Sequence, residues 1–319
     1  MLKVPSQRLF HWYKECLSGY KEALADGSYG SYNWEDSTGQ ERMVAVLKSE
    51  NVGPRMMIDE KHIGGDAFTI FSNQENGKIA LMAETQDVMS LDTLLNELGP
   101  VLDNVEEVTM DFSPSYKKVI KQVMPDAVLV GDKFHTLQSC FESLQDMRIR
   151  IKQEELTKMN ELKKRNKSYK IPREKNGETI IEIITRSKRS LYKYDEELSE
   201  EQKTRMSILF DRYPQLKKAY QWITDFRKWY KIDNHKNILQ LEKELEEWCE
   251  EIEVDKIQEM KNLANMIDRH KEMILSYFNK GGTNAKAENL NSRIQRFLIT
   301  NYGIRNKKFF LFRLGKYFS

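Results

Sequence analysis

Three carboxylates stand in places where their charge needs an explanation. Asp59 and Asp111 each follow a short run of apolar and β-branched residues, and Glu288 is the one acid from Lys286 to the end of the chain, among eight Lys and Arg residues. A buried carboxylate is costly unless a partner neutralises it. Mg²⁺ is a common partner, because it takes one or two protein carboxylates and completes its shell with water and phosphate oxygens. A metal site is one hypothesis. Capping of a strand end or pairing with a cation is the other, and the residues leave both open.

The elements that would position these acids follow an α/β order. Gly64-Gly65 and Asn76-Gly77 separate short apolar runs, which predicts three antiparallel strands joined by tight hairpins. Two more strands follow, each after a helix, and such crossovers demand parallel pairing. If the strands of Asp59 and Asp111 are neighbours, both carboxylates converge near the carboxyl ends of the strands, where α/β sheets place ligands. The predicted strands are 55–63, 66–73, 78–85, 106–112 and 127–135, and the helices between them are 90–102, with Ser90 as N-cap, and 115–125.

The rest of the chain is predicted to be helical. Residues 8–25 have the pattern of one amphipathic helix, and residues 41–48 are expected to form a second. After residue 135 the strand pattern stops. From residue 199 to 279 apolar residues recur three and four apart, which predicts at least three helices, with breaks near Tyr213-Pro214 and at 231–237. A final helix is expected to begin near Ala285.

Composition excludes several classes of protein. Of the 319 residues 39% are hydrophobic and 31% are charged, which is typical of a charge-rich globular chain. The sequence contains no run of 18 apolar residues, so no membrane span is expected, and its first residues lack the apolar stretch of a signal peptide. The three cysteines lie far apart without a CxxC pair, which favours a reducing cytoplasm over disulfides or a zinc ribbon.

Four sequence strings carry a resemblance to a known family. They are IDEKHIGG, VTMDFSPSYKKVIKQVMPDAVLVGDKFH, RSLYK and TNAKAENLNSRIQRFLITNYGIRNKKFF, which occur in this order from residue 58 to about residue 310. Together they resemble the DDE transposases of the ISL-three family of bacterial insertion sequences. Those enzymes pair an opening Asp-Glu with a second Asp a few residues before a Tyr, continue to Asp-x-Phe-His, and end on a Thr-Asn-x-x-x-Glu-x-x-Asn helix.

The resemblance implies the roles of individual residues. Asp59, Asp111 and Glu288 would be the catalytic triad and would hold two Mg²⁺ ions, with Mn²⁺ able to substitute. Asp132 and His135 match an Asp-x-x-His element that suits DNA contact or support of the second Asp. Asn284 and Asn291 lie three or four residues from Glu288, on its face of a helix. The residues expected to bind DNA or support the site are Asp132, His135, Asn284, Asn291, Arg293, Arg296 and Arg305; the arginines could equally be ordinary helix-surface residues.

The resemblance also implies the fold. It predicts an α/β, ribonuclease H-like core with a mixed five-stranded sheet, interrupted by a large all-helical insertion. The expected domains are a short N-terminal helical segment at 1–54, the first part of the core at 55–150, the insertion at 151–280, and a completing helix with a basic tail at 281–319.

The implied function is that of a transposase catalytic subunit. It would nick the ends of an insertion sequence and join the 3′-hydroxyl to target DNA by two-metal, in-line phosphoryl transfer. Two alternatives stay open, namely a stand-alone ribonuclease H-like nuclease and a non-catalytic DNA-binding protein derived from a transposase. The expected location is the bacterial cytoplasm, in association with the nucleoid.

The expected partners are DNA and other proteins. Family members usually carry an N-terminal zinc ribbon and helix-turn-helix, but only about fifty residues precede the first strand here, with Cys16 alone. We therefore expect a separately encoded DNA-binding protein or a truncated enzyme. The need to hold two element ends predicts a dimer or larger assembly on DNA.

Two further features of the sequence invite interpretation. Basic residues between 163 and 173, extended by Arg186, Lys188 and Arg189, are typical either of a polyanion-binding segment or of a solvated loop. An aromatic set at helical spacing is predicted to form the core of the helical region instead of a platform for bases. It consists of Trp222, Phe226, Trp229, Tyr230 and Trp248.

Overall fold

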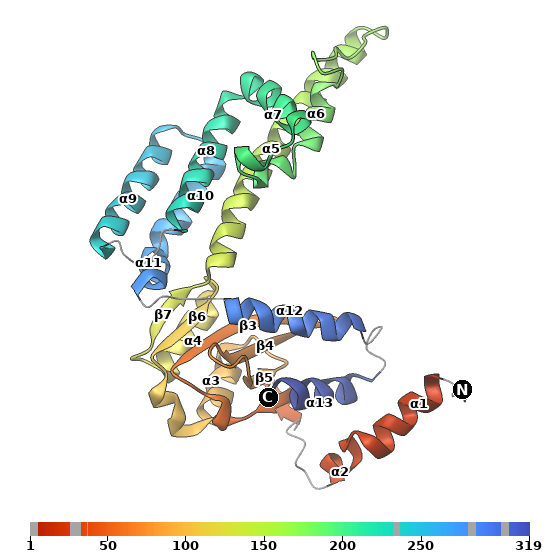
Figure 1. Ribbon diagram of the computed structural model, residues 1–319, viewed down its shortest axis with the longest axis vertical. Coiled ribbons are helices and arrows are strands. Elements are labelled where there is room, and N and C mark those ends of the chain that lie inside the picture. The colour runs from red at the N-terminus through yellow and green to blue at the C-terminus, as the bar shows by residue number, and fades with distance from the viewer. Residues whose placement is uncertain (1–5, 26–32, 37, 232–236, 280–284, 301–305) are drawn as a thin grey trace. The chain divides into compact units, whose positions relative to one another are not determined.

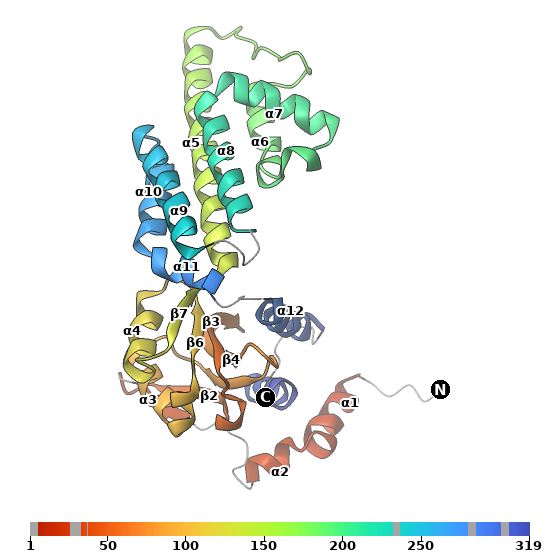
Figure 2. The same cartoon turned by 60° about the vertical axis from the view of Figure 1, so that its left-hand side comes forward.

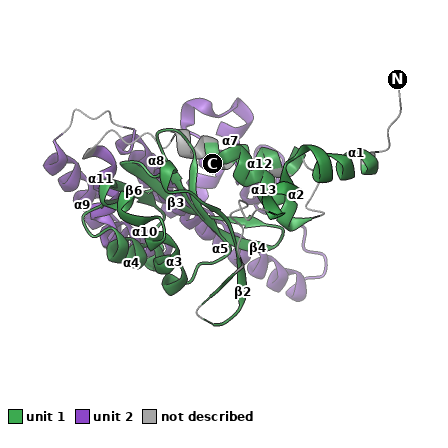
Figure 3. Ribbon diagram, turned by 90° about the horizontal axis from the view of Figure 1, so that it is seen from below, with its two compact units in different colours: residues 1–132, 280–319 green, residues 133–279 purple. Residues whose placement is uncertain are grey.

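The computed structural model describes residues 6–25, 33–36, 38–231, 237–279, 285–300 and 306–319. The chain divides into two compact units, shown in different colours in Figure 3. The first, called here the sheet unit, consists of Met1–Asp132 and Lys280–Ser319. The second, the helical unit, is Lys133–Asn279. The polypeptide thus leaves the sheet unit after Asp132 and returns to it at Lys280.

The sheet unit contains a mixed sheet of seven strands in the order β1-β2-β5-β4-β3-β6-β7. β3, β4 and β5 pair antiparallel through consecutive hairpins, whereas β6 pairs parallel with β3, and β7 pairs parallel with β6. The five expected strands are present as β3 to β7, and β1 and β2 extend the sheet beyond five. The strands are β1 (Asn33–Glu35), β2 (Glu41–Leu47), β3 (Arg55–Ile63), β4 (Asp66–Asn73), β5 (Ile79–Ala83), β6 (Glu107–Met110) and β7 (Val128–Gly131).

The prediction of a helix at residues 41–48 is wrong, because this segment is strand β2. Val44, Ala45 and Val46 are all buried, and β2 pairs antiparallel with β5. A strand buried on both faces has no alternating pattern, and a short apolar run of that kind cannot be told from a helix by periodicity. Pairing with β5 decides the structure.

Helices cover both faces of the sheet. Figure 3 shows α3 (Val88–Asn96) and α4 (Pro114–Val123) on one face, and α12 (Ala285–Thr300) and α13 (Lys307–Phe318) on the other. The α3 helix is capped by Asp87, whose carboxylate accepts a hydrogen bond from the Ser90 amide at 2.9 Å. The N-cap is thus three residues earlier than the expected Ser90.

Helices α12 and α13 dock on the sheet through one hydrophobic cluster. Leu290 and Ile294 are the buried residues that α12 contributes to it. The chain therefore returns to the same sheet after the helical unit. The other buried members are Ala45, Val46, Ile63, Phe68, Ile70, Ile79, Met82, Phe310, Leu311, Leu314 and Phe318.

The N-terminal segment is helical but is not the single helix that the sequence predicts. It consists of α1 (Ser6–Trp12), a π-helical turn (Tyr13–Leu17) and α2 (Tyr20–Ala25). Gly19 interrupts it with a φ of 76°, a left-handed conformation that glycine adopts readily. Beyond the break, Tyr20 packs with Phe309 and Phe312 of α13.

The helical unit has no strand among its described residues beyond an isolated bridge between Arg173 and Thr179. Its aromatic residues form the core that the sequence predicted: Phe226 and Tyr230 are each 1% exposed, and the Trp248 indole donates a hydrogen bond to the Trp222 carbonyl at 2.9 Å. The helices, which Figures 1 and 2 label, are α5 (Lys133–Arg165), α6 (Ile180–Arg186), α7 (Glu200–Arg212), α8 (Pro214–Trp229), α9 (Ile238–Val254), α10 (Gln258–Arg269) and α11 (Lys271–Asn279).

Within the described ranges, none of the helices combines the length and apolar character needed to cross a membrane.

Candidate active site

Asp59 belongs to β3, and Asp111 directly follows β6, the parallel neighbour of β3 in the sheet. The register of β3 and β6 places Met57 opposite Thr109. Continued by two residues along each strand, the same register would bring Asp59 beside Asp111. Adjacent strands lie about 4.8 Å apart, and residues opposite each other in a parallel pair project from the same face. We infer from this register that the two acids are neighbours on one face of the sheet.

Asp132 extends this row of carboxylates. Met110 of β6 lies opposite Gly131 of β7, so the next pair in register is Asp111 and Asp132. The Asp132 amide donates to the Met110 carbonyl at 2.8 Å, which continues the pairing beyond β7, and Asp132 is buried. Sequence reasoning put Asp132 at the mouth of the last strand, but its alignment with both other acids required the register.

The face that carries Asp59 is the face that α12 covers. Asp59 lies opposite Ile70 of β4. Ile70 belongs to the same hydrophobic cluster as Leu290 and Ile294 of α12. Glu288 is in α12, two residues before Leu290, although its side chain lies outside the described residues. The fold thus docks the helix that carries the third predicted ligand on the side of the sheet from which Asp59 projects.

Glu60 lies on the opposite face, as expected for the residue next to Asp59 in a strand. It is opposite Thr69 of β4, and Thr69 contacts Tyr116 of α4 on the other side of the sheet. Glu60 pairs with His62, Oε1 to Nε2, at 2.8 Å. This carboxylate therefore has a partner of its own, away from Asp59.

Local hydrogen bonds orient the two neighbouring acids. The Oδ1 atom of Asp111 accepts a hydrogen bond from the Ser113 amide at 2.9 Å, and Ser113 in turn is the N-cap of α4. Oδ1 of Asp59 accepts from the Glu60 amide at 2.8 Å. Both side chains are half-buried. A backbone amide therefore fixes one oxygen of each carboxylate.

The Tyr116 hydroxyl contacts Thr69 of β4 on the sheet face opposite to that of Asp59. The Thr69 hydroxyl donates to the Thr85 carbonyl at 2.5 Å. A hydroxyl has one proton, so the Tyr116 hydroxyl, 3.0 Å away, must be the donor to Thr69. Burial, and then the nearby carboxylates of Glu60, Asp111 and Asp59, raise the pKa of Tyr116 far above its usual range. Tyr116 therefore stays a neutral hydrogen-bond donor.

The other predicted site residues are distributed over both units. His135 is half-buried in the first turn of α5, with its ring 5.7 Å from that of Phe134. Arg296 is exposed on α12. Asn284 and Arg305 lie outside the described residues. Asn291 is in α12, and its side chain is not among those described.

Much of the positive charge near the C-terminus is used within the sheet unit. The Arg293 guanidinium lies over the Phe318 ring, 5.0 Å from its centroid. Lys307 pairs with Asp66 at 2.5 Å and with Glu84 at 2.8 Å, and Lys316 donates to the Ser18 carbonyl at 2.9 Å. These cations hold α12, α13 and the N-terminal helices to the sheet.

The donor set suits a hard divalent cation. Two neighbouring aspartate carboxylates match the one or two protein carboxylates that Mg²⁺ commonly takes. No cluster of three or more His, Cys, Asp or Glu side chains that could hold a metal occurs within the described part of the chain. That part excludes the side chain of Glu288, the predicted third ligand.

Comparison with known proteins identifies the family of the chain. A family model described as transposase, of the DDE type and the ISL-three group, matches residues 56–314. The match begins three residues before Asp59, ends in α13, and includes Asp111, Asp132 and Glu288. No protein of curated function matches the sequence.

Proposed function

The chain belongs to the ISL-three family of DDE transposases, and from this premise we propose that it is a catalytic subunit that nicks insertion-sequence ends and joins them to target DNA. The observation that carries the proposal is the alignment of Asp59 with Asp111 on the sheet face that α12 covers. Membership of the family makes the chain a transposase. The metal-dependent mechanism and its residues are our inference.

In the proposed site Asp59, Asp111 and Glu288 would hold two Mg²⁺ ions, whose chemistry there would be Lewis-acid stabilisation of the attacking and leaving oxygens of an in-line displacement. Attack by water on the phosphorus breaks the P–O3′ bond at the element end and leaves a 3′-hydroxyl. Attack by that hydroxyl on a target phosphate then joins the two DNAs and releases a 3′-hydroxyl of the target. No covalent bond to the protein is needed.

The chain's own residues prepare this site. The Ser113 amide holds the Asp111 carboxylate, so its orientation is set before a ligand arrives. Tyr116 donates its hydrogen bond to Thr69, on the far side of the sheet, and does not compete for the carboxylates. Glu60 is turned away and paired with His62. We therefore assign no metal-binding role to Glu60.

We extend the proposal to the wider architecture. Three antiparallel strands followed by two parallel ones, β3 to β7, support a ribonuclease H-like core, with the helical unit as an insertion between Asp132 and Lys280. Mn²⁺ is expected to replace Mg²⁺. A separately encoded DNA-binding protein and a dimer or larger assembly on paired element ends complete the expected machinery.

The test is DNA nicking and strand joining with the ends of the element that encodes the chain, both intact and pre-cleaved. We expect Asp111→Ala to abolish both reactions, whereas Glu60→Ala, one residue from Asp59 but on the opposite face, keeps most of the activity. Near-normal activity in Asp111→Ala would sink the proposal. Cleavage without joining would favour a stand-alone nuclease, and DNA binding without either reaction would favour a non-catalytic role.

A further inference from the structure

A run of exposed cations ends the longest helix of the helical unit. We define the distal basic segment as residues 163–170, which contain Lys163, Lys164, Arg165, Lys167 and Lys170. All five side chains are exposed, and none of them forms an ion pair with any residue that the structure describes. Figure 2 shows the end of α5 and the loop that follows it at one tip of the unit, away from α9, α10 and α11.

The acidic residues of the same unit do not balance this charge. Residues 241–255 hold eight acids, but the structure neutralises several of them locally. Lys271 pairs with Glu242 at 3.2 Å and with Glu246 at 2.7 Å, and Lys261 pairs with Glu253 at 2.7 Å. The acidic helix α9 is thus matched by α10 and α11, whereas the distal basic segment has no such match among the residues described.

Stabilisation of the helix end explains only part of the segment. Lys163, Lys164 and Arg165 occupy the last turn of α5, where positive charges stabilise the helix by interacting with the negative end of its dipole. Lys167 and Lys170 lie beyond the helix. A hydrogen-bonded turn at residues 166–169 contains the first of them and precedes the second. The Asn166 side-chain oxygen accepts a hydrogen bond from the Ser168 amide, and the Asn166 backbone carbonyl accepts one from the Tyr169 amide, both at 3.0 Å. The fold therefore presents more cations than the helix needs.

We propose that the distal basic segment is a second DNA-binding surface, which binds the phosphate backbone of duplex DNA without reading its sequence. The inference rests on the proposed function, because it takes DNA as the polyanion. Lysine is a compact point charge, and contacts to phosphate position DNA without carrying sequence information. The surface belongs to the helical unit and uses none of the carboxylates of the candidate active site.

The test compares two variants with the same loss of charge. The first is Lys163→Gln/Lys164→Gln/Lys167→Gln/Lys170→Gln. The control is Lys203→Gln/Lys217→Gln/Lys228→Gln/Lys243→Gln, which removes four exposed lysines elsewhere in the same unit. Binding of a labelled duplex of unrelated sequence is measured by fluorescence anisotropy, in EDTA, over a series of salt concentrations.

We expect the first variant to bind at least about tenfold more weakly at low salt. Its plot of log K against log salt should become shallower by about 0.9 for each phosphate that the variant no longer neutralises, up to about 3 to 4 for four lysines. The control should stay close to the wild type. Equal effects of the two variants would overturn the proposal. So would a first variant that binds DNA normally but no longer self-associates, because the segment would then bind protein.

Nicking by the wild type separates the two hypotheses. Because binding is measured in EDTA, it does not depend on catalysis. If the first variant loses DNA affinity but the wild type never nicks DNA, the second DNA-binding surface is supported and the catalytic assignment is refuted. If the wild type nicks DNA and the first variant binds DNA as tightly as the wild type, the catalytic assignment stands and the second DNA-binding surface is refuted.

Discussion

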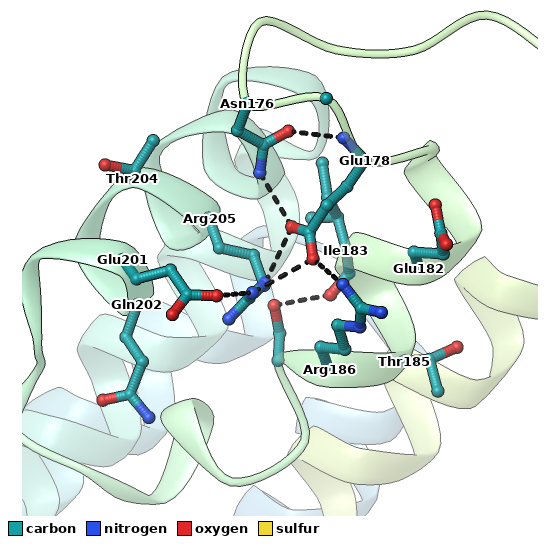
Figure 4. Close-up of polar contacts among 12 residues, drawn as sticks. Asn176, Glu178, Glu182, Ile183, Thr185, Arg186, Glu201, Gln202, Thr204 and Arg205 are labelled. Carbon is teal, nitrogen blue, oxygen red and sulfur yellow. Dashed lines mark hydrogen bonds and ion pairs between the residues drawn. The ribbon is translucent and has the colours of Figure 1, made fainter.

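Removing the charge of Glu178 is predicted to destabilise the helical unit by about 3 kcal/mol. Figure 4 shows this carboxylate at the centre of a polar network. It accepts two hydrogen bonds from Arg205, at 2.9 and 3.0 Å, one from Asn176 at 2.7 Å, and one from Arg186. Glu178 is 9% exposed and Arg205 is 7% exposed. Glu178→Gln would leave the buried guanidinium without its bidentate partner.

The magnitude follows from what remains around Arg205. Removing one partner of a buried ion pair costs about 3–5 kcal/mol. Here Glu201 also binds Arg205, at 2.7 Å, but the Glu201 side chain is 80% exposed and can compensate only in part. The expected loss is therefore at the lower end of that range. The matched control is Glu201→Gln, which removes an exposed partner of the same guanidinium and should cost about 0.5 kcal/mol.

The assay is urea unfolding followed by tryptophan fluorescence. Trp222 and Trp229 are buried in the helical unit and Trp248 is half-buried there, so the signal reports mainly on this unit. The midpoint should fall strongly for Glu178→Gln and hardly at all for Glu201→Gln, with unchanged slopes. Equal losses for the two variants would refute the reasoning, because burial would then not decide the strength of the pair.

Two further predictions follow from the same contacts. Hydrogen bonds from Arg205 lower the pKa of Glu178 to about 2 from an ordinary 4.5, so its contribution to stability is complete above about pH 4.5 and is lost as the pH falls towards about 2. The difference in unfolding free energy between the wild type and Glu178→Gln should therefore shrink over that interval. A constant difference would be inconsistent with an ionised Glu178. Tyr116→Phe removes the donor to Thr69 and should cost about 1 kcal/mol in urea unfolding, against almost nothing for Tyr317→Phe, whose side chain is 65% exposed; equal losses would mean that the buried hydroxyl holds nothing in place.

The strands that form hairpins were predictable because turn chemistry is local. Gly64 and Gly65 have φ values of 64° and 96°, which other residues rarely adopt, so two glycines between apolar runs indicate a tight turn. Strand β2 had no such signal, since Val44, Ala45 and Val46 are all buried. Its structure depends on the partner strand β5, which is distant in sequence.

Helix α13 also escaped prediction. Its consecutive residues Phe309, Phe310, Leu311 and Phe312 are all buried, because α13 packs on the sheet with one side and on Tyr20 with the other. A helix that is apolar all round has no amphipathic stripe. Its Lys and Arg residues led to the prediction of a basic tail, although Lys307 and Lys316 bind neighbouring elements of the sheet unit.

Part of the candidate site could be predicted from local sequence patterns, and part could not. The proximity of Asp59 and Asp111 followed from strand alternation and a helical crossover, which are short-range rules. That α12 returns to the face of Asp59 depends on contacts such as Leu290 and Ile294 with the sheet, which no local pattern in the sequence specifies. The family resemblance was needed to nominate Glu288.

Whether Glu288 shares a metal site with Asp59 and Asp111 can be measured by Mn²⁺ binding to the complex with pre-cleaved duplex DNA. Binding is followed by electron paramagnetic resonance in the wild type, Asp111→Asn, Glu288→Gln and Glu60→Gln. We expect two bound ions in the wild type and in Glu60→Gln, and the loss of at least one ion in each of the other two variants. Binding by Glu288→Gln that equals that of the wild type would rule out Glu288 as a metal ligand.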